Sequence, residues 1–397
     1  MSAAVEELST LQPFEPNETF PTALPPGHTP LKSPTYLQAI TISMYSVIII
    51  LAVGGNAIVC YVVFRARRMR TVMNFFIVSL ALSDILMAIF CIPFTFLANL
   101  VFNYWPFGTV LCPIVTYLQV VTVFLSSFTL VAISLDRYIA IIYPLRRKLT
   151  KRQAFIVIAS IWVVSFLIPI PTAITSRSHK YVNTSTAPTF CEEILWDTVE
   201  AKLVYNGVLF FLQYVNPLAI LIVTYGRISF VMWAVKTPGE AMSSRDQRMS
   251  ESKRKIIKMM ITVVVIYSIC WLPLNVINFT GAIDNRIYNI KGMNYIWMAS
   301  HWLAMSNCMY NPFVYCWMNA KFRNGFLRVL SCLTCGVVHC QENMELQNLR
   351  RQDTMLTSMN GQSNSTRRFN SSKRSSSSAS KRSYCEYTAM KEKAVDG

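Results

Sequence analysis

The chain has little charge, few histidines and no recognisable catalytic motif. Only 14% of its 397 residues are Asp, Glu, Lys or Arg. Its histidines are scattered without the spacing of metal ligands: His28, His179, His301 and His339. We find neither a nucleophile–base set nor a phosphate-binding loop, so the sequence argues against an enzyme.

Internal repeats and an N-terminal signal peptide are also missing from the sequence. A transporter typically shows repeated halves with paired charges inside the membrane, whereas here only Asp84 lies deep inside an apolar stretch. Met1–Lys32 lacks a basic start followed by an apolar core. We therefore disfavour a transporter and expect the first long apolar stretch to act as its own insertion signal.

Long apolar runs are abundant. Hydrophobic residues make up 53% of the chain, and the mean hydropathy is +0.37. A helix needs about 20 mostly apolar residues to cross a bilayer. Seven stretches reach that length: Leu37–Phe64, Val72–Leu100, Val110–Ile142, Ala154–Ile174, Tyr205–Val235, Ile256–Phe279 and Tyr295–Met318. The predicted fold is an all-α membrane protein, a bundle of seven transmembrane helices.

The net charge of +17 is unevenly distributed. Basic residues gather between the first two stretches, between the third and fourth, before the sixth and after the seventh, whereas acidic residues gather before the first and fifth. Because Lys and Arg collect on the cytoplasmic side, we predict a plasma-membrane protein with an extracellular N-terminus and a cytoplasmic C-terminus. The charge then reflects topology and attraction to membrane lipids, not nucleic-acid binding.

Cysteines provide a separate test of this topology. Of the eleven, only Cys112 and Cys191 lie near the predicted outer surface, where conditions are oxidising. Two lone thiols there are more often bridged than free, so we predict a disulfide between them. Glycosylation sequons at Asn17 and Asn183 fall on the same predicted side.

Asp84 lies midway along the second apolar stretch. A lone carboxylate there is protonated, paired or bound to a cation. We expect hydroxyl and amide groups from other stretches to converge on it: Asn56, Ser126, Asn307 and Asn311. These hard oxygen donors suit a sodium ion, and a purely structural hydrogen-bond cluster is the alternative. No other cofactor is expected.

Three motifs stand in order along the chain. Asp136-Arg137-Tyr138 closes the third stretch, where a charged pair at the membrane boundary usually marks function. Cys270-Trp271-Leu272-Pro273 and Asn311-Pro312-Phe313-Val314-Tyr315 each place an aromatic residue near a helix-kinking proline. With Asp84, this order and spacing resembles the rhodopsin-like (class A) G-protein-coupled receptors over about Leu37 to Cys340.

The resemblance implies a two-state switch. In such receptors Arg137 is held by Asp136 at rest and is released to contact a heterotrimeric G protein as the sixth helix swings outward. Tyr225 and Tyr315 resemble the tyrosines that stabilise the open state. The residues assigned to the switch are Asp136, Arg137, Tyr138, Tyr225, Tyr267, Trp271, Pro273, Pro312 and Tyr315.

The sequence departs from the family at two places. An aliphatic residue and a phenylalanine usually pair beneath the ligand, whereas Ser127 and Tyr267 occupy those places here. We predict a hydrogen bond between these two hydroxyls that raises basal activity. Cys308 replaces the usual serine beside the sodium cluster, which slightly weakens the case for sodium.

The resemblance also narrows the ligand. Met305 stands where opsins carry the retinal lysine, and Gln119 stands where amine receptors carry an aspartate. A neutral Gln both donates and accepts hydrogen bonds, which suits a C-terminal peptide amide, and an acidic rim suits a ligand arginine. The predicted ligand contacts are Gln119, Tyr117, Glu192, Glu193, Asn275, Asn278, Asp284, His301 and Trp302.

Among peptide receptors, the stretches Tyr104–Gly108, Ser134–Ala140 and Tyr143–Leu145 are most similar to the neuropeptide Y branch and its invertebrate RYamide and luqin relatives. One departure is Ala282, where neuropeptide Y receptors carry an aspartate. The ligand implied is a secreted neuropeptide, amidated and ending in Arg and an aromatic residue. Tachykinin-like or RFamide-like branches are the alternative.

The chain divides into four predicted regions. Residues 1–36 form a disordered extracellular segment, 37–318 the helical domain, 319–340 an amphipathic eighth helix with a palmitoylation region, and 341–397 a disordered cytoplasmic tail. The palmitoylation candidates are Cys332, Cys335 and Cys340. The serine-rich tail suits receptor kinases and arrestin, because each phosphate adds negative charge.

Overall fold

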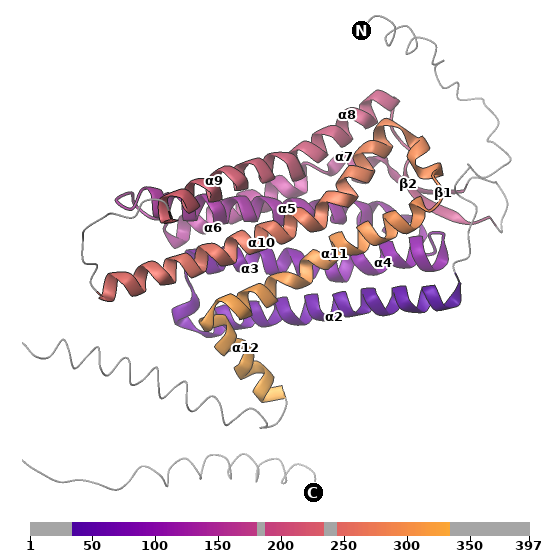
Figure 1. Cartoon of the computed structure of the whole chain (residues 1–397). Coiled ribbons are helices and arrows are strands. Elements are labelled where there is room, and N and C mark those ends of the chain that lie inside the picture. Colours follow the sequence, from indigo (N-terminus) through magenta and orange to yellow (C-terminus); the bar gives the residue numbers. More distant parts are fainter. Residues whose placement is uncertain (1–33, 181–186, 234–243, 334–397) are drawn as a thin grey trace, which may run out of the picture. The chain divides into compact units, whose positions relative to one another are not determined.

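The computed structural model describes residues 34–180, 187–233 and 244–333. Within them, seven long helical segments form one bundle (Figure 1). In chain order the segments are α2 (Thr35–Arg65); α3, η3, α4 and η4 (Val72–Leu86, Met87–Cys91, Ile92–Phe96 and Leu97–Phe102); α5 (Gly108–Ile142); α6 and α7 (Lys151–Leu167 and Ile170–Thr175); α8, η5 and α9 (Val199–Phe210, Phe211–Val215 and Asn216–Trp233); α10 (Ser244–Ile283); and α11 (Met293–Met318). The predicted short eighth helix is α12 (Ala320–Leu333).

Six of these segments are long and apolar enough to cross a membrane, counting only the described residues. The seventh, α11, is a helix of 26 residues that carries buried polar side chains: Ser300, His301, Ser306, Asn307 and Asn311. A membrane helix tolerates such groups where they face the bundle interior. The predicted seven-helix fold is therefore confirmed, and the buried face of α11 is partly polar.

Some helices extend beyond the apolar stretches that predicted them. The sixth begins at Ser244, whereas its apolar stretch begins at Ile256, and the fifth begins at Val199 and not at Tyr205. Hydropathy marks only the part that needs a nonpolar surrounding, while the backbone hydrogen bonds of a helix continue into polar sequence. The apolar stretches therefore mark the spanning part of each helix and not its ends.

Threonines define several helix starts. The side chains of Thr71 and Thr198 each accept a hydrogen bond from a backbone N–H in the first turn of α3 and α8. Thr150 and Gln153 form a reciprocal capping box at the start of α6. Such caps satisfy amides that have no intrahelical acceptor, so the short loops before these helices end at defined residues.

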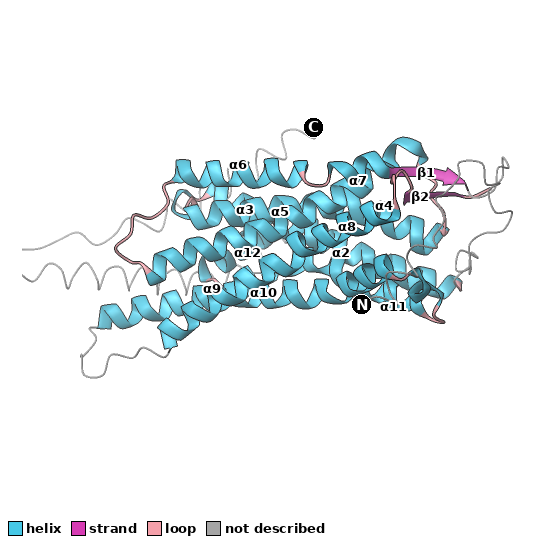
Figure 2. Cartoon of the chain, turned by 90° about the horizontal axis from the view of Figure 1, so that it is seen from above, coloured by secondary structure: helices cyan, strands magenta, loops and turns pink. Residues whose placement is uncertain are grey.

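Each helix packs mainly against its neighbours in the series α10, α11, α2, α3, α5 and α9. Helix α6 packs against α5 (Figure 2). Gly55 of α2 lies against Pro312 of α11: a Cβ added at Gly55 would stand 2.9 Å from the Cβ of Pro312. Beside Gly54, in contrast, no atom lies within 4 Å of such a Cβ. Gly55 is therefore the residue that permits close approach of α2 to α11.

The two ends of the bundle differ. At one end, β1 (Ser176–Lys180) and β2 (Thr189–Glu193) form an antiparallel hairpin in which Ser178 pairs with Cys191. This hairpin end also contains the starts of α2 and α5 (Figure 1). The other end carries α12, the 3-10 turn η2 (Arg67–Met69) and the loop between α5 and α6, and is called the α12 end below. A further 3-10 turn, η6 (Asn285–Asn289), joins α10 to α11.

Candidate functional site

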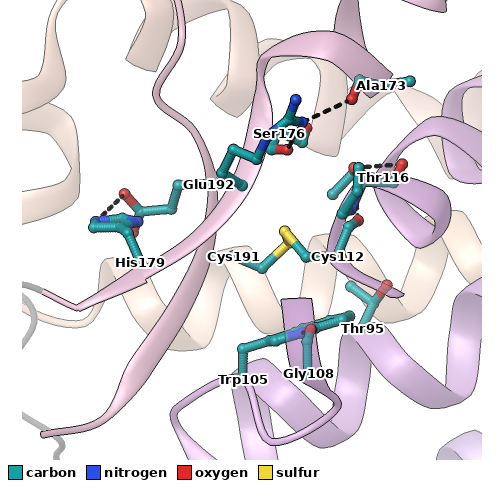
Figure 3. The surroundings of a disulfide bond; sticks show 12 residues. Thr95, Trp105, Gly108, Cys112, Thr116, Ala173, Ser176, His179, Cys191 and Glu192 are labelled. Carbon is teal, nitrogen blue, oxygen red and sulfur yellow. Dashed lines mark hydrogen bonds and ion pairs between the residues drawn. A yellow bond between two sulfur atoms is a disulfide. The ribbon is translucent and has the colours of Figure 1, made fainter. Parts of the chain in front are cut away.

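A disulfide joins the hairpin to the first turns of α5. Cys112 and Cys191 are bonded, with their Cα atoms 5.6 Å apart (Figure 3), so the predicted bridge is confirmed. Trp105 adds two hydrogen bonds: its backbone N–H donates to the carbonyl of Thr189, and its indole Nε1 donates to the carbonyl of Gly108, 2.7 Å away. Strand β2 is therefore held across the mouth of the bundle by one covalent bond and one backbone bond.

Two of the three predicted acidic contacts lie on this hairpin. Glu192 faces His179 across the strands, with Oε2 3.9 Å from Nε2. The carboxylate of Glu193 accepts a hydrogen bond from Trp196 Nε1 at 3.2 Å. Burial raises the pKa of Glu193 above its ordinary value of 4.5, against the hydrogen bond from Trp196 and the positive charge of Lys202, which lower it. A partly buried carboxylate that lacks a full ion pair is a suitable partner for a cationic ligand.

The third acid, Asp284, is placed differently. It caps η6 by accepting the backbone N–H of Arg286, and its Oδ1 lies 3.9 Å from the guanidinium of the same residue. Both side chains are largely exposed. Asp284 is thus partly neutralised by its own neighbour, and its structural role in the turn is already evident.

Gln119 lies deeper in the bundle, on α5. Its side-chain oxygen is 3.4 Å from the hydroxyl of Thr95 on α4. Among the described residues, its amide nitrogen has no hydrogen-bond partner. The half-buried Gln119 therefore offers two N–H donors to a ligand, while Thr95 orients its carbonyl. Thr95 was not predicted, because no pattern in a single sequence indicates which side chain of one helix faces another.

His301 and Trp302 stand on α11 at the same half of the bundle. The Nδ1 atom of the buried His301 lies 2.7 Å from the hydroxyl of Tyr45 on α2, and Trp297 stacks on its ring at 4.9 Å. His301 Nε2 and Trp302 Nε1 are buried without a hydrogen-bond partner among the described residues. Because an unpaired buried polar group is costly, these atoms are available to a ligand that brings its own polar groups.

The remaining predicted contacts are held by other helices or exposed. The hydroxyl of Tyr117 donates to the backbone carbonyl of Phe166 on α6, 2.7 Å away, so this side chain serves the packing of α5 against α6. Asn275 donates to the carbonyl of Trp271 on its own helix. Asn278 is exposed on α10. The structure thus brings Gln119, His301 and Trp302 to the bundle interior and leaves Tyr117 and Asn278 in other roles.

A buried polar cluster surrounds Asp84 on α3. Asn311 of α11 donates to Asp84 Oδ2 at 2.8 Å, and Ser126 of α5 lies 3.0 Å from the hydroxyl of Ser83, the neighbour of Asp84. Asn56 donates to the backbone of Ala52 and Cys308 through its amide nitrogen, which leaves Oδ1 buried and unpartnered within the described part of the chain. Asn307 is buried on α11. These are hard oxygen donors, so the residues present fit a sodium ion.

The Asp136–Arg137 pair is formed. Arg137 Nε donates to Asp136 Oδ2 at 3.0 Å, and a second guanidinium nitrogen contacts the same oxygen. Tyr225 of α9 interacts electrostatically with Arg137, and Tyr315 of α11 interacts with both Tyr225 and Asp84. Arg137, Tyr225 and Tyr315 therefore lie one after another between the α12 end and the Asp84 cluster, and are called the polar path below. Tyr138 lies beside it, its ring 6.2 Å from that of Tyr143.

Between the ligand-contact residues and this path lies a layer that joins α5, η5 and α10. The hydroxyl of Tyr267 donates to the backbone carbonyl of Gln213, 2.9 Å away, and Trp271 lies one turn above Tyr267 next to Pro273. Ser127 lies next to Tyr267, but its hydroxyl donates to the carbonyl of Phe124, so both hydroxyl protons are used elsewhere and the bond between the two hydroxyls stays a prediction. Gln213 belongs to a π-helical turn, a feature common at functional sites, and the sequence carried no signal for it.

Several predicted modification sites lie outside the described residues: Asn17, Asn183, Cys335 and Cys340. The side chain of Cys332, at the end of α12, is likewise not described.

A seven-helix membrane bundle with a tethered hairpin at one end and a partly buried Asp–Arg pair at the other defines a class of membrane receptors. Residues 55–315 match the model of the 7 transmembrane receptor (rhodopsin family). The chain therefore belongs to the rhodopsin family of seven-transmembrane receptors, the class A G-protein-coupled receptors.

Its relatives include receptors named for neuropeptides. The RYamide receptor of Drosophila melanogaster is 46% identical over 302 residues, which cover 75% of this chain and 64% of that relative. The RYamide receptor of Tribolium castaneum is 43% identical over 309 residues, 76% of this chain and 83% of that relative. Neuropeptide FF receptor 2 of Mus musculus is 38% identical over 308 residues, 73% of this chain and 72% of that relative.

Proposed function

We propose that this chain is a non-enzymatic cell-surface receptor for a secreted, C-terminally amidated neuropeptide that ends in Arg and an aromatic residue. The similarity to two RYamide receptors supports this peptide class. The observation that carries the proposal within the structure is the pair of unused amide N–H donors on Gln119, oriented by Thr95 below the tethered hairpin. A peptide amide offers the matching carbonyl and N–H groups.

The charged and aromatic groups of the same end support the rest of the ligand. We assign Glu193 to the ligand arginine, because its carboxylate is half-buried and has no full ion pair among the described residues. It would take the role of the aspartate that neuropeptide Y receptors carry at the position of Ala282. A charge-assisted bond to arginine is among the stronger polar contacts in proteins. The buried indole N–H of Trp302 and the buried Nε2 of His301 would then face the aromatic end of the peptide.

Orientation follows from chemistry at the two ends. The Cys112–Cys191 disulfide belongs on the oxidising, extracellular side. The loops at the α12 end are rich in Arg and Lys, which supports a cytoplasmic position for them. The N-terminus is then extracellular and the C-terminus cytoplasmic, and a peptide arriving from outside meets the hairpin end first.

Signalling in this proposal uses the polar path from Asp84 to Arg137. Agonist binding favours a state in which the cytoplasmic half of α10 moves outward about Pro273 and Arg137 leaves Asp136 to contact a heterotrimeric G protein. A sodium ion held by Asp84, Ser126, Asn307 and Asn311 would supply a positive charge that stabilises the resting arrangement. Leu145, fully exposed in the loop after α5 at the same end, offers an apolar contact for the G protein.

The remaining assignments concern the tails. We assign glycosylation to Asn17 and Asn183, palmitoylation to Cys332, Cys335 and Cys340, and phosphorylation by receptor kinases with arrestin binding to the serine-rich tail. Mass spectrometry of the receptor from eukaryotic cells, with and without glycosidase or hydroxylamine, would detect each modification at its residue.

A peptide panel tests the ligand. Cells that express the receptor are challenged with peptides ending in Arg-Tyr-amide, Arg-Phe-amide and the tachykinin-type amide, while calcium and cAMP are recorded. We expect the Arg-Tyr-amide peptides to be the most potent. A stronger response to the tachykinin-type or Arg-Phe-amide peptides would select the alternative branch, and silence despite surface expression would refute an amidated-peptide ligand.

The amide contact has its own test. The same peptide is compared as C-terminal amide and free acid on wild-type receptor, on Gln119→Ala and on Thr95→Val. We expect wild type to prefer the amide, and Gln119→Ala to lose about tenfold or more in amide potency, the scale of one buried hydrogen bond. If Gln119→Ala keeps the full preference for the amide, Gln119 does not recognise it.

A further inference from the structure

Lys202 lies in the first turns of α8, next to Glu193, the acid assigned above to the ligand arginine. Its Nζ donates a hydrogen bond to the backbone carbonyl of Glu193, 3.3 Å away. Among the described residues this is the one hydrogen bond of its side chain, and no carboxylate of those residues lies within ion-pair distance of it. A positive charge of the protein itself therefore already lies at the place proposed for the cation of the ligand.

The charge of Lys202 also acts on the side chain of Glu193. Burial raises the pKa of Glu193, whereas the hydrogen bond from Trp196 and the positive charge of Lys202 lower it. An ammonium that stabilises an ionised carboxylate loses part of that interaction energy when a second cation takes the same carboxylate. Lys202 thus compensates part of the charge of Glu193 before a peptide binds.

Glu193 is fixed in place by its neighbours along the chain. The disulfide to α5 lies two residues before it. Directly after it, Ile194 and Leu195 both donate their backbone N–H groups to the carbonyl of Thr175, at 3.1 and 3.2 Å. The indole of Trp196 donates to its carboxylate at 3.2 Å. Because the backbone on both sides is anchored, the carboxylate does not follow a cation that moves away.

The side chain of Lys202 is held less firmly. Its ammonium stands at the end of a flexible aliphatic stem and is held by one hydrogen bond of 3.3 Å among the described residues. The residue is only partly buried and precedes the apolar stretch that begins at Tyr205. Rotation about the stem therefore carries the charge into water. A fixed carboxylate and a movable ammonium allow an incoming guanidinium to displace the ammonium.

We propose that Lys202 competes with the arginine of the peptide for Glu193, and so sets the affinity and the charge selectivity of the ligand site. A guanidinium displaces the ammonium because its planar fork forms two parallel hydrogen bonds with one carboxylate, which an ammonium does not. An uncharged ligand group leaves Lys202 in place. The inference rests on the proposed function, since it takes Glu193 as the partner of the ligand arginine.

Peptide affinity is measured by competition binding on the full-length receptor in cell membranes, with a labelled Arg-Tyr-amide peptide as tracer. Two competing peptides differ at one position. One ends in Arg-Tyr-amide, and the other carries citrulline in place of this Arg, which keeps the shape and N–H groups without the charge. Lys202→Met keeps the aliphatic stem and removes the ammonium. We expect it to bind the arginine peptide about three- to tenfold more tightly than wild type, the scale of one charge interaction near a protein surface, and the citrulline peptide within about twofold.

Two further variants separate the charge of Lys202 from its structural contact. Lys202→Arg keeps a cation at this place, so its affinity for both peptides should stay within about twofold of wild type. Lys291→Met removes an exposed lysine from the turn between η6 and α11, which does not act on Glu193. Because charges this exposed are screened by salt, its affinities should also stay within about twofold of wild type.

A double variant traces the effect to Glu193. In Glu193→Gln with Lys202→Met, the gain should disappear, because no carboxylate is left to compete for. An equal gain for both peptides, a loss of affinity in Lys202→Met, or a gain that persists in the double variant would overturn the proposal.

Glu193→Gln alone separates this proposal from the function on which it rests. If this variant keeps the wild-type preference for arginine over citrulline, Glu193 is not the partner of the ligand arginine, and both proposals fail at this acid. If it removes the preference while Lys202→Met binds both peptides as wild type does, only the role of Lys202 is refuted.

Discussion

The hydroxyl of Tyr267 on α10 donates a hydrogen bond to the backbone carbonyl of Gln213 in the π-helical turn η5, at 2.9 Å. Tyr214 of the same turn donates to the carbonyl of Ser268 on α10, also at 2.9 Å. Two hydroxyls therefore join the fifth and sixth helical segments at the level where the sixth must pivot. A phenylalanine in place of either tyrosine removes one of these bonds.

This arrangement changes the sign of one expectation. The sequence suggested that a Ser127–Tyr267 bond raises basal activity, but the structure shows Tyr267 bonded to Gln213 while Asp136 still holds Arg137. We now expect Tyr267→Phe to raise basal G-protein activation, by up to about fivefold, since one hydrogen bond contributes about 1 kcal/mol to the resting state. Ligand-free nucleotide exchange measures it. Tyr104→Phe, at an exposed tyrosine of the hairpin end, is the control, and a fall in basal rate would restore the original interpretation.

The close approach of α2 and α11 predicts a sharp difference between adjacent glycines. Gly55→Ala places a methyl 2.9 Å from the rigid ring of Pro312, whereas Gly54→Ala points into open space. Overpacking of this kind costs about 1–3 kcal/mol. We expect Gly55→Ala to lower the melting temperature and the surface expression of the receptor, with Gly54→Ala near wild type. Equal behaviour of the two variants would show that the helices yield without cost.

Burial of Glu193 predicts a pH dependence of peptide binding. Because burial raises its pKa, the folded protein binds this proton more tightly than the unfolded chain does. The unfolding free energy therefore rises as the pH falls between the raised pKa and 4.5. The charge that would hold a ligand arginine is lost over the same range, so acidification should weaken binding even though it stabilises the fold.

The measurement compares peptide affinity at about pH 7.4 and pH 5.5 in three receptors. Wild type is expected to lose affinity at the lower pH. Glu193→Gln is expected to bind weakly at both pH values, with little change between them. Glu192→Gln retains Glu193 and should keep the wild-type pH dependence. If Glu193→Gln retains it too, another group is responsible.

The Asp84 cluster predicts a sodium effect. Because Asp84, Asn311 and the Ser83–Ser126 pair are buried together, a cation bound there should favour the resting state and lower agonist affinity. We expect agonist affinity to fall several-fold when sodium replaces choline at equal ionic strength, and Asp84→Asn to abolish the difference. An identical sodium response in Asp84→Asn would show that the sodium effect does not arise from an ion bound at Asp84.

Much of the architecture was accessible from the sequence, because transmembrane helices satisfy their own backbone bonds and need only a long apolar run. The Cys112–Cys191 bridge followed from counting thiols on the oxidising side, and the structure confirms it. The start of α10 at Ser244 was missed, since the polar part of that helix has no hydropathy signal.

The site was less accessible. Gln119 was identified by its type and position, but its partner Thr95 comes from a different helix. Tyr117, predicted to contact the ligand, turns its hydroxyl to Phe166. The rotation of α5 about its axis decides which of its side chains face the ligand site and which face another helix. A single sequence does not specify that rotation.

The sequence by itself determined that this chain spans a membrane seven times, which thiols pair, and which residue types stand at the switch, because these depend on local composition and on the chemistry of two compartments. Only the tertiary structure decided what those residues touch. The Tyr267–Gln213 bond, the contact of Gly55 with Pro312 and the approach of Thr95 to Gln119 all join distant segments. They arise from helix packing, in which the energy of a side chain depends on neighbours that lie far away along the chain.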